Sequence, residues 1–295
     1  PMEGFWTWGG GSVFGMFSLG DDFGFSDFAG SGIVHMAGAA AALAGVLVLG
    51  ARKGKYGKDG SVNAIPGANL PLATLGTFIL WMGWFGFNGG SVLKLGDIAN
   101  ANSVAMVFLN TNAAAAGGVI VALIVAKLMF GKADLTMALN GALAGLVAVT
   151  APCAWIASWA AVVIGIIAGF IVVFGVYLLD ALHIDDPVGA VPVHGFNGLW
   201  GLISVGIFAD GTYGNYATEA PFATGLLYGG GAGQIFSQLI GVVVLVIWAF
   251  GCGLILFKVL DAILGVRVHP SEEIQGLDVL EHGTPAYPEF YSTRF

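Results

Sequence analysis

Two histidines lie in matching sequence surroundings. His35 follows Asp27 by eight positions, and His194 follows Asp186 by eight. In both segments a glycine comes three residues after the aspartate, and a valine directly precedes the histidine. A neutral imidazole offers one hydrogen-bond donor and one acceptor, and it can pass a proton to a second ring. The two side chains therefore suit the passage of a small hydrogen-bonding solute or a proton relay.

Two other interpretations of these histidines remain open at the level of the sequence. A histidine in a membrane helix can simply hydrogen-bond across a helix contact, and two facing histidines can ligate a haem or a metal ion. No carboxylate or thiol lies within helical reach of either ring to complete a metal site. We therefore predict no metal site and no cofactor, and we do not expect an enzyme.

The composition is that of an integral membrane protein. Only 9% of the 295 residues are charged, 57% are hydrophobic, and the mean hydropathy is +0.86, which lies far outside the range of soluble domains. The net charge of −8 argues against nucleic acid as a partner, because the ten lysines and arginines form no basic face. The expected surroundings are the lipid bilayer of the cytoplasmic membrane.

Stretches without charge mark the expected crossings, because about 20 apolar residues span a hydrocarbon core of roughly 30 Å. The uncharged stretch between Asp134 and Asp180 would make a helix about twice as long as the membrane is thick. We divide it at Pro152, since proline disfavours helix at the residue before it. The prediction is an all-α integral membrane bundle at 1–258, followed by a cytoplasmic tail at 259–295. Seven spans are expected, at about 28–51, 70–91, 101–127, 136–151, 157–179, 187–209 and 233–257.

The basic residues predict the direction of the crossings. If the first span runs inward, every lysine and arginine except Lys94 lies on the cytoplasmic side, Arg294 in the tail included. The C-terminus is then cytoplasmic. Four spans separate the first from the sixth, so the two histidine helices run in opposite directions, as the inverted repeats of transporters do. Each histidine then lies about 12 Å from its helix start, and both fall near the midplane.

A second cluster of candidate residues closes the second span, at the expected outer face. Phe87, Asn88 and Ser91 place one aromatic ring and two polar side chains within a helical turn. Together they can meet a cation through the face of the ring and through a hydroxyl acceptor. Trp8, in the expected outer N-terminal segment, can add a second ring.

Other residues in these regions receive structural roles. Asp27 and Asp186 precede helices, where a carboxylate caps free backbone N–H groups and meets the positive end of the helix dipole. Trp84 is expected to anchor the second span at the membrane interface, where tryptophan is enriched. Asn88 is placed among the supporting residues.

Four motifs in the same order closely resemble the ammonium transporter family, Amt, which is related to the Rhesus proteins. The resemblance covers nearly the whole chain. Its motifs are Asp27-Phe-Ala-Gly-Ser-Gly-Ile-Val-His35-Met, Gly83-Trp-Phe-Gly-Phe87-Asn88-Gly-Gly-Ser91, Asp185-Asp186-Pro-Val-Gly-Ala-Val-Pro-Val-His194-Gly195 and Gly276-Leu-Asp-Val-Leu-Glu-His282-Gly283.

The resemblance implies more than the spacing does. Family members are homotrimers of eleven-helix subunits, each with a narrow hydrophobic pore, and the tail couples the pore to PII-type regulatory proteins. On that basis ammonium is recruited and deprotonated at an outer vestibule and crosses as ammonia. The roles implied are twin pore histidines for His35 and His194, an outer gate for Phe87, recruitment for Trp8 and Ser91, and support of the vestibule for Asp27.

The seven expected spans are fewer than the eleven of the family. The resemblance implies that the first four family helices are absent, and we expect the sequence to be a fragment of a longer chain. The function that we expect is transport of ammonium or ammonia. The alternative is an ammonium sensor that signals through its cytoplasmic tail.

Overall fold

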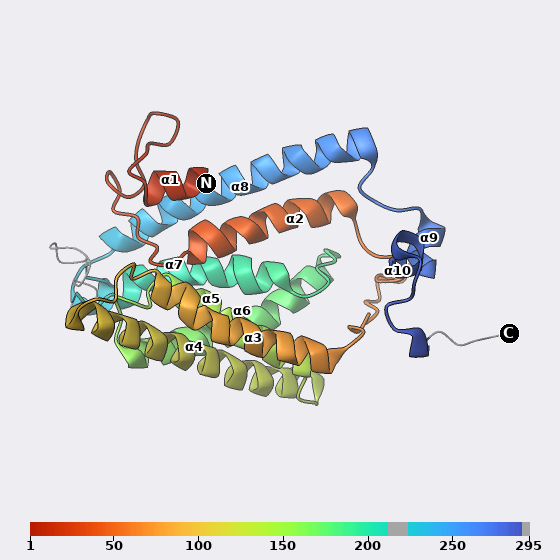
Figure 1. The fold of residues 1–295 in the computed structure, drawn as a ribbon, viewed down its shortest axis with the longest axis horizontal. Helices are drawn as coiled ribbons and strands as arrows, with labels where there is room; N and C mark the ends of the chain where they lie inside the picture. Colours follow the sequence, from red (N-terminus) through yellow and green to blue (C-terminus); the bar gives the residue numbers. More distant parts are fainter. Residues whose placement is uncertain (212–223, 291–295) are drawn as a thin grey trace.

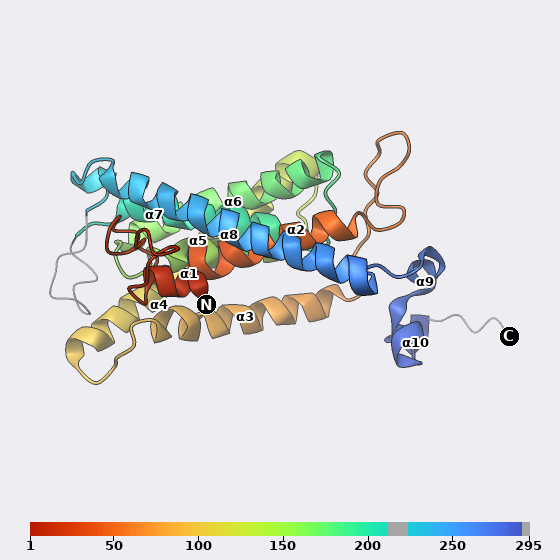
Figure 2. The same ribbon diagram turned by 90° about the horizontal axis from the view of Figure 1, so that it is seen from above.

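The computed structural model describes residues 1–211 and 224–290, and these residues form a bundle of helices (Figures 1 and 2). The described part contains no β-strand, only two isolated bridges. Residues 291–295 of the predicted tail, including Arg294, lie outside the described residues. The α-helices are α1 (Met2–Thr7), α2 (Ala37–Leu49), α3 (Leu70–Gly90), α4 (Ile98–Phe130), α5 (Leu135–Thr150), α6 (Ser158–Ala181), α7 (Asn197–Phe208), α8 (Gly233–Leu264), α9 (Pro270–Gln275) and α10 (Leu277–His282).

Two of these helices begin with a π-helical segment. The segment η1 (Ser31–Met36) leads into α2 and contains His35, and η2 (Val191–Phe196) leads into α7 and contains His194. Short 3₁₀ turns, η3 (Leu226–Tyr228) and η4 (Pro288–Phe290), complete the described elements. Both histidines therefore lie in the first turns of their helices, where backbone hydrogen bonding departs from the regular α pattern.

The long helices fall in the stretches where the seven spans were expected, and some of their bounds differ. Among the described residues, six helices are long and apolar enough to cross a membrane, and α5 is shorter, at 16 residues. Its second half is almost entirely buried between other helices, so protein rather than lipid surrounds it. The sixth span becomes helical at Val191 rather than at Pro187. The boundary predicted after residue 258 falls inside α8, which continues to Leu264.

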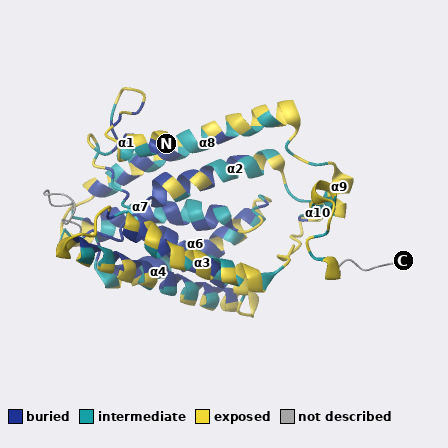
Figure 3. Ribbon diagram, viewed as in Figure 1, coloured by how far each residue is buried: buried dark blue, intermediate teal, exposed yellow. Residues whose placement is uncertain are grey.

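Small residues allow α4, α5 and α6 to pack closely. A Cβ atom on Gly118 would overlap the carbonyl oxygen of Gly141, and one on Gly145 or Gly165 would overlap that of Ala114. Membrane helices associate through such close backbone approach, since burial of apolar surface gives little driving force between them in lipid. These three helices form the buried core of the bundle (Figure 3).

Helices α3 and α8 are the least buried of the long helices. Only 11% of the most apolar stretch of α3 and 17% of that of α8 is buried, and both show a mixture of exposed, intermediate and buried residues in Figure 3. A helix can expose apolar side chains when its surroundings are as apolar as leucine. These two faces therefore suit contact with lipid or with other membrane helices.

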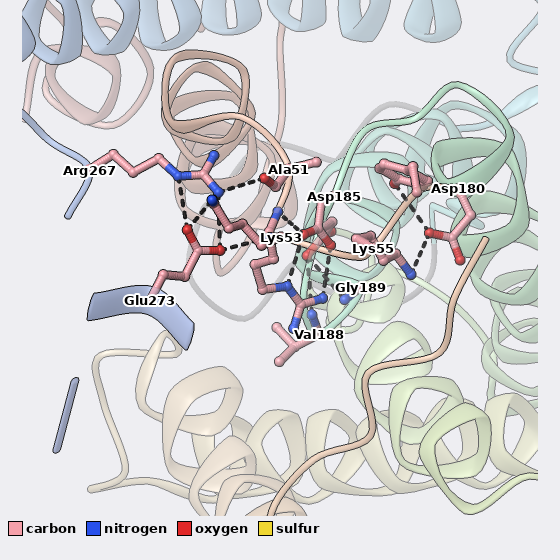
Figure 4. Close-up of polar contacts among 12 residues, drawn as sticks. Ala51, Lys53, Lys55, Asp180, Asp185, Val188, Gly189, Arg267 and Glu273 are labelled. Atoms are coloured by element: carbon pink, nitrogen blue, oxygen red, sulfur yellow. Dashed lines mark hydrogen bonds and ion pairs between the residues drawn. The ribbon is translucent and has the colours of Figure 1, made fainter. Parts of the chain in front are cut away.

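One end of the bundle, which we call the tail end, carries α9, α10 and the loop after α2 (Figure 1). Three ion pairs join its segments (Figure 4). Arg52 binds Asp185 with Nη2 at 2.8 Å from Oδ1, and Lys55 Nζ lies 2.9 Å from Asp180. Arg267 and Glu273, 2.8 Å apart, also contact the backbone at the end of α2. The described tail is thus attached to the helix that follows His35.

Acidification should destabilise the tail end through Asp185. Its side chain is 1% exposed and accepts three hydrogen bonds from Arg52, so the pKa of Asp185 lies below its ordinary value. A carboxylate with a lowered pKa stabilises the folded protein at pH values above the ordinary aspartate pKa of about 4. This stabilisation is lost as the pH falls through the lowered pKa of the folded state. We expect the thermal midpoint of the purified protein to fall below about pH 4.

Two variants isolate this contribution. Asp185→Asn should weaken the dependence of the thermal midpoint on pH below about pH 4, because the group that titrates is gone. Asp21→Asn serves as the control, since Asp21 is exposed and no hydrogen bond between described residues holds its carboxylate. Equal pH dependence in Asp185→Asn and the unsubstituted protein would contradict the assignment.

Candidate functional site

The rings of His35 and His194 face each other directly. Their Nδ1 atoms lie 3.2 Å apart, and the ring centroids are 5.2 Å apart with planes inclined by 22°. This distance fits a hydrogen bond in which one ring donates and the other accepts. The two neutral rings must then hold opposite tautomers, so one free Nε2 is a donor and the other an acceptor. The pair offers both functions to a solute.

The same distance bears on the metal alternative. A metal ion bound tetrahedrally lies about 2.0–2.1 Å from each imidazole nitrogen, which sets two such nitrogens about 3.3 Å apart. The 3.2 Å between the Nδ1 atoms therefore fits two ligands of one ion as well as a hydrogen bond. A metal site would need further ligands, and among the described residues no group of three or more His, Cys, Asp or Glu side chains could hold a metal ion.

Aromatic rings cover His35 on its other side. The indole of Trp84 stacks on the imidazole at 4.9 Å with planes inclined by 15°, and the ring of Phe87 lies 5.5 Å away. Trp84 Nε1 donates to Thr150 Oγ1 at 2.9 Å, which fixes the indole against α5. His35 Nε2 is buried and has no hydrogen-bond partner within the described structure. This nitrogen is therefore available to a solute.

A cavity of about 220 Å³ lies beside the histidine pair. Its wall is almost entirely apolar apart from the two rings. A small neutral solute in this cavity would find hydrogen-bonding partners at the imidazoles. The lining residues are Val34, His35, Gly38, Ala39, Ala42, Ala190 and His194.

Asp27 holds the start of η1. One carboxylate oxygen accepts from the backbone N–H groups of Gly30 and Ser31, and the other from those of Gly32 and Ile33, at 2.8–3.0 Å. A helix start leaves four N–H groups without partners, and this single carboxylate satisfies four. Gly30 has φ +112°, a conformation that favours glycine. This bend lets the chain fold the aspartate back over the helix start.

Asp186 is placed in the same way at the start of η2. Its carboxylate accepts from the N–H groups of Gly189 at 3.1 Å, Val191 at 2.7 Å and Val188 at 3.4 Å. Gly189, three residues after the aspartate like Gly30, has φ +77°. This explains why both segments carry a glycine three residues after the aspartate. Each carboxylate reaches the backbone N–H groups at its helix start only if the chain bends in the left-handed conformation, which glycine adopts most easily.

The two histidine helices cross where side chains are small. A Cβ on Gly198 would lie 2.5 Å from the carbonyl oxygen of Ser31, and one on Gly201 would lie 2.6 Å from Ser31 Oγ. Ser31 Oγ in turn donates to the carbonyl of Val147 at 2.6 Å and accepts from the N–H of Ala151 at 2.6 Å. This close approach of η1 to α7, anchored on α5, brings the two rings together.

The predicted outer residues divide into two groups. Trp8 donates from Nε1 to the carbonyl oxygen of Asp27 at 2.9 Å, and the residue is 54% exposed. Ser91 donates to the carbonyl of Phe87 at 3.0 Å. No hydrogen bond between described residues joins Trp8 to Ser91. Asn88 is fully buried and donates to Thr111 at 2.9 Å, so its amide joins α3 to α4.

The sequence interpretation missed the role of Trp84. It was expected at the membrane interface, but it is 6% exposed and stacked on His35. Trp84 precedes Phe87 by three residues, which places both on one helix face. This spacing was the signal in the sequence that could have placed Trp84 beside Phe87 and His35. The hydrogen bonds of Thr150 and Ser31 could not be found in this way, because their partners are distant in sequence.

The sequence is similar to proteins that are named as ammonium transporters. The model of the Ammonium Transporter Family matches residues 1–287. The chain is 54% identical over 297 residues to ammonium transporter Amt2 of Archaeoglobus fulgidus, which covers 99% of this chain and 62% of that protein. It is 40% identical over 285 residues to a putative ammonium transporter of Synechocystis sp., covering 96% of this chain and 58% of that one. The chain thus spans about six-tenths of the length of these relatives.

Solved structures show the same fold. A protein described as a sensor Amt protein superposes with a TM-score of 0.82 at 39% identity, covering 96% of this chain and 66% of its own. Mep2 of Candida albicans superposes with a TM-score of 0.78 at 31% identity, covering 92% and 57%. The apolar helices and these relatives identify a multi-pass membrane protein. Since the family model covers nearly all of the sequence, this chain belongs to the ammonium transporter family.

Proposed function

We propose that this chain forms part of an ammonium transporter in which His35 and His194 are the hydrogen-bonding track of the pore. The observation that carries the proposal is the pair of imidazoles, with Nδ1 atoms 3.2 Å apart, beside an apolar cavity of about 220 Å³. The named activity of relatives such as Amt2 of Archaeoglobus fulgidus supports the substrate.

The physical chemistry of the cavity favours passage of the neutral species. A bare cation near the centre of a bilayer costs several kcal/mol or more, so ammonium should release its proton before it enters. Ammonia then exchanges hydrogen bonds with the free ring nitrogens, one a donor and one an acceptor. The imidazole pair also offers a route for the released proton.

The proposed outer site lies toward α1 and the end of α3 opposite the tail end. Trp8 offers an exposed ring face to a cation, and Ser91 offers a hydroxyl oxygen. Directional hydrogen bonds to ammonium would distinguish it from a spherical cation. Asp27, Asn88 and Asp186 are proposed to support this site and the pore rather than to contact the solute.

Uptake by liposomes tests the proposal. The full-length protein, reconstituted into liposomes, should take up labelled methylammonium down its gradient, and protein-free liposomes should not. Uptake equal to that of protein-free liposomes would overturn the proposed transport.

Phe87 is proposed as an outer gate, and its truncation should change conduction without preventing folding. The ring contacts His35 and Trp84 but is 41% exposed, so Phe87→Ala leaves no sealed cavity. We expect uptake of methylammonium to change by about fivefold or more while the thermal midpoint shifts by less than about 4 °C.

Phe85→Ala is the matched control for this variant. Phe85 lies on the same helix, and its ring contacts Phe108 rather than His35. It should leave uptake close to that of the unsubstituted protein. A Phe87→Ala protein that fails to assemble would instead assign the ring a packing role.

The assembly and orientation of the protein complete the proposal. We propose a homotrimer in the cytoplasmic membrane, with the tail end in the cytoplasm, where Arg52, Lys53 and Lys55 lie. The tail is then accessible to a cytoplasmic regulator of the PII type. Chemical crosslinking in native membranes would reveal trimers, and labelling of a cysteine placed at residue 284 would report the side of the membrane.

A sensor function is the second candidate. It is favoured by the tail contacts, in which Arg267 donates to the carbonyls of Leu49 and Ala51 at the end of α2, and by the likeness to a sensor Amt protein. A sensor would change the hydrogen exchange of α9 when ammonium is added, with little uptake by liposomes. A transporter would show substantial uptake.

A further inference from the structure

Helix α8 carries one fully buried amide in its first turns. Gln238 is 0% exposed. Its Oε1 accepts from the N–H of Ser26 at 2.8 Å and from Gln234 Nε2 at 3.1 Å. Its Nε2 donates to the carbonyl oxygens of Ser26 at 2.6 Å and Leu202 at 3.2 Å. All four hydrogen-bonding positions of the amide are therefore used.

Gln238 binds Ser26, which directly precedes the capping residue Asp27. Both backbone groups of Ser26 are held by the one amide, as if by a neighbouring strand. The next residue is Asp27, whose carboxylate caps the helix of His35 and whose carbonyl accepts from Trp8 Nε1. The position of Ser26 therefore sets the position of the cap and of the exposed indole together.

A comparable clamp precedes the second cap. Asp185, directly before Asp186, is held through its carboxylate by Arg52, which follows α2. In both cases the residue before a capping aspartate is fixed by a side chain from another element. The two clamps differ in chemistry, since a neutral amide acts near the Trp8 end and an ion pair acts at the tail end.

We propose that Gln238 is a positioning residue for the outer substrate site, which it builds by fixing Ser26 and, through it, Asp27 and the Trp8 indole. Gln238 itself does not contact the solute. The inference rests on the proposed function, because it assigns Trp8 to the capture of ammonium. Its expected consequence is larger on affinity than on the maximal rate, since the Asp186 cap and the packing of η1 on α5 and α7 through Ser31 still hold the two histidine helices when Ser26 loses its partner.

The test compares Gln238→Met with Gln234→Met in the full-length protein in liposomes. Methionine keeps the length of the side chain and removes every amide hydrogen bond. We expect Gln238→Met to raise the KM for methylammonium about tenfold, because three backbone groups, two of them on Ser26, lose their partners, while the maximal rate changes by less than about twofold. Gln234→Met should change both values less, since Gln234 binds Gly24 and leaves Ser26 held.

Hydrogen exchange provides a readout that does not depend on transport. The amides of Gly30–Ile33, which donate to Asp27, should exchange faster in Gln238→Met than in Gln234→Met. Unchanged KM and unchanged exchange would overturn the inference. If the unsubstituted protein showed no uptake, the proposed function would fail, and the exchange would still decide whether Gln238 positions the cap.

A conservative variant covers the case in which Gln238→Met does not assemble. Gln238→Asn keeps an amide at this position, but its side chain is one methylene shorter and cannot reach both backbone groups of Ser26 in the same way. Its KM is expected between those of the unsubstituted protein and a Trp8→Ala variant. A KM equal to that of the unsubstituted protein would show that the paired contact with Ser26 is dispensable, and this would overturn the inference.

Discussion

Replacing His35 with alanine is expected to lower methylammonium uptake by about a hundredfold or more, because the two imidazoles are the only polar side chains among the described residues that line the cavity. The substitution removes the hydrogen bond between the Nδ1 atoms and leaves ammonia without a partner across half of the apolar path. His194→Ala should have a similar effect. In electrical recordings, ammonium-driven current should disappear in both variants.

His183→Ala is the control for these two variants. His183 is exposed near the tail end, and its ring packs against Tyr56. Its loss should leave uptake nearly unchanged. Assembly of the His35 and His194 variants should match that of the unsubstituted protein, as judged by gel filtration. Normal current in both variants would contradict the role of the pair.

Replacing Asp27 with asparagine is expected to abolish uptake and to destabilise the protein. The carboxylate accepts four backbone N–H groups, whereas an amide can accept from two and must turn its own N–H donors toward the others. Hydrogen bonds to a charged group contribute about 1.5–3 kcal/mol each, so losing two costs about 3–6 kcal/mol. The helix start that carries His35 should then fray, which lowers both the thermal midpoint and uptake.

The second cap provides the comparison for Asp27→Asn. Asp186 accepts three N–H groups, one of them at 3.4 Å, and it is only half-buried. Asp186→Asn should therefore lower the thermal midpoint less than Asp27→Asn. In Asp27→Asn, the backbone amides of Gly30–Ile33 should exchange faster than in the unsubstituted protein. The amides of η2 should be affected less in the same variant. Equal stability of Asp27→Asn and the unsubstituted protein would exclude the capping role.

The class of the protein and most of its helices could be predicted from the sequence. Long uncharged stretches are costly to expose to water, so they mark membrane helices without any knowledge of the fold. Pro152 lies between α5 and α6, where the sequence predicted a break, because the effect of a proline on the backbone is local. The start of the sixth span was predicted four residues early, since the bend at Gly189 is set by the reach of the Asp186 carboxylate.

The sequence by itself determined which residues could do chemistry: two histidines, each eight residues after a capping aspartate, in helices expected to run in opposite directions. Only the tertiary structure decided that these rings lie 3.2 Å apart, that Trp84 stacks on one of them, and that Gln238 clamps Ser26. The physical reason is that spacing along one helix fixes which side chains share its face, whereas contacts between helices depend on how closely their backbones approach. That approach is set by small residues such as Gly198 and Gly201, whose partners lie far away in the sequence.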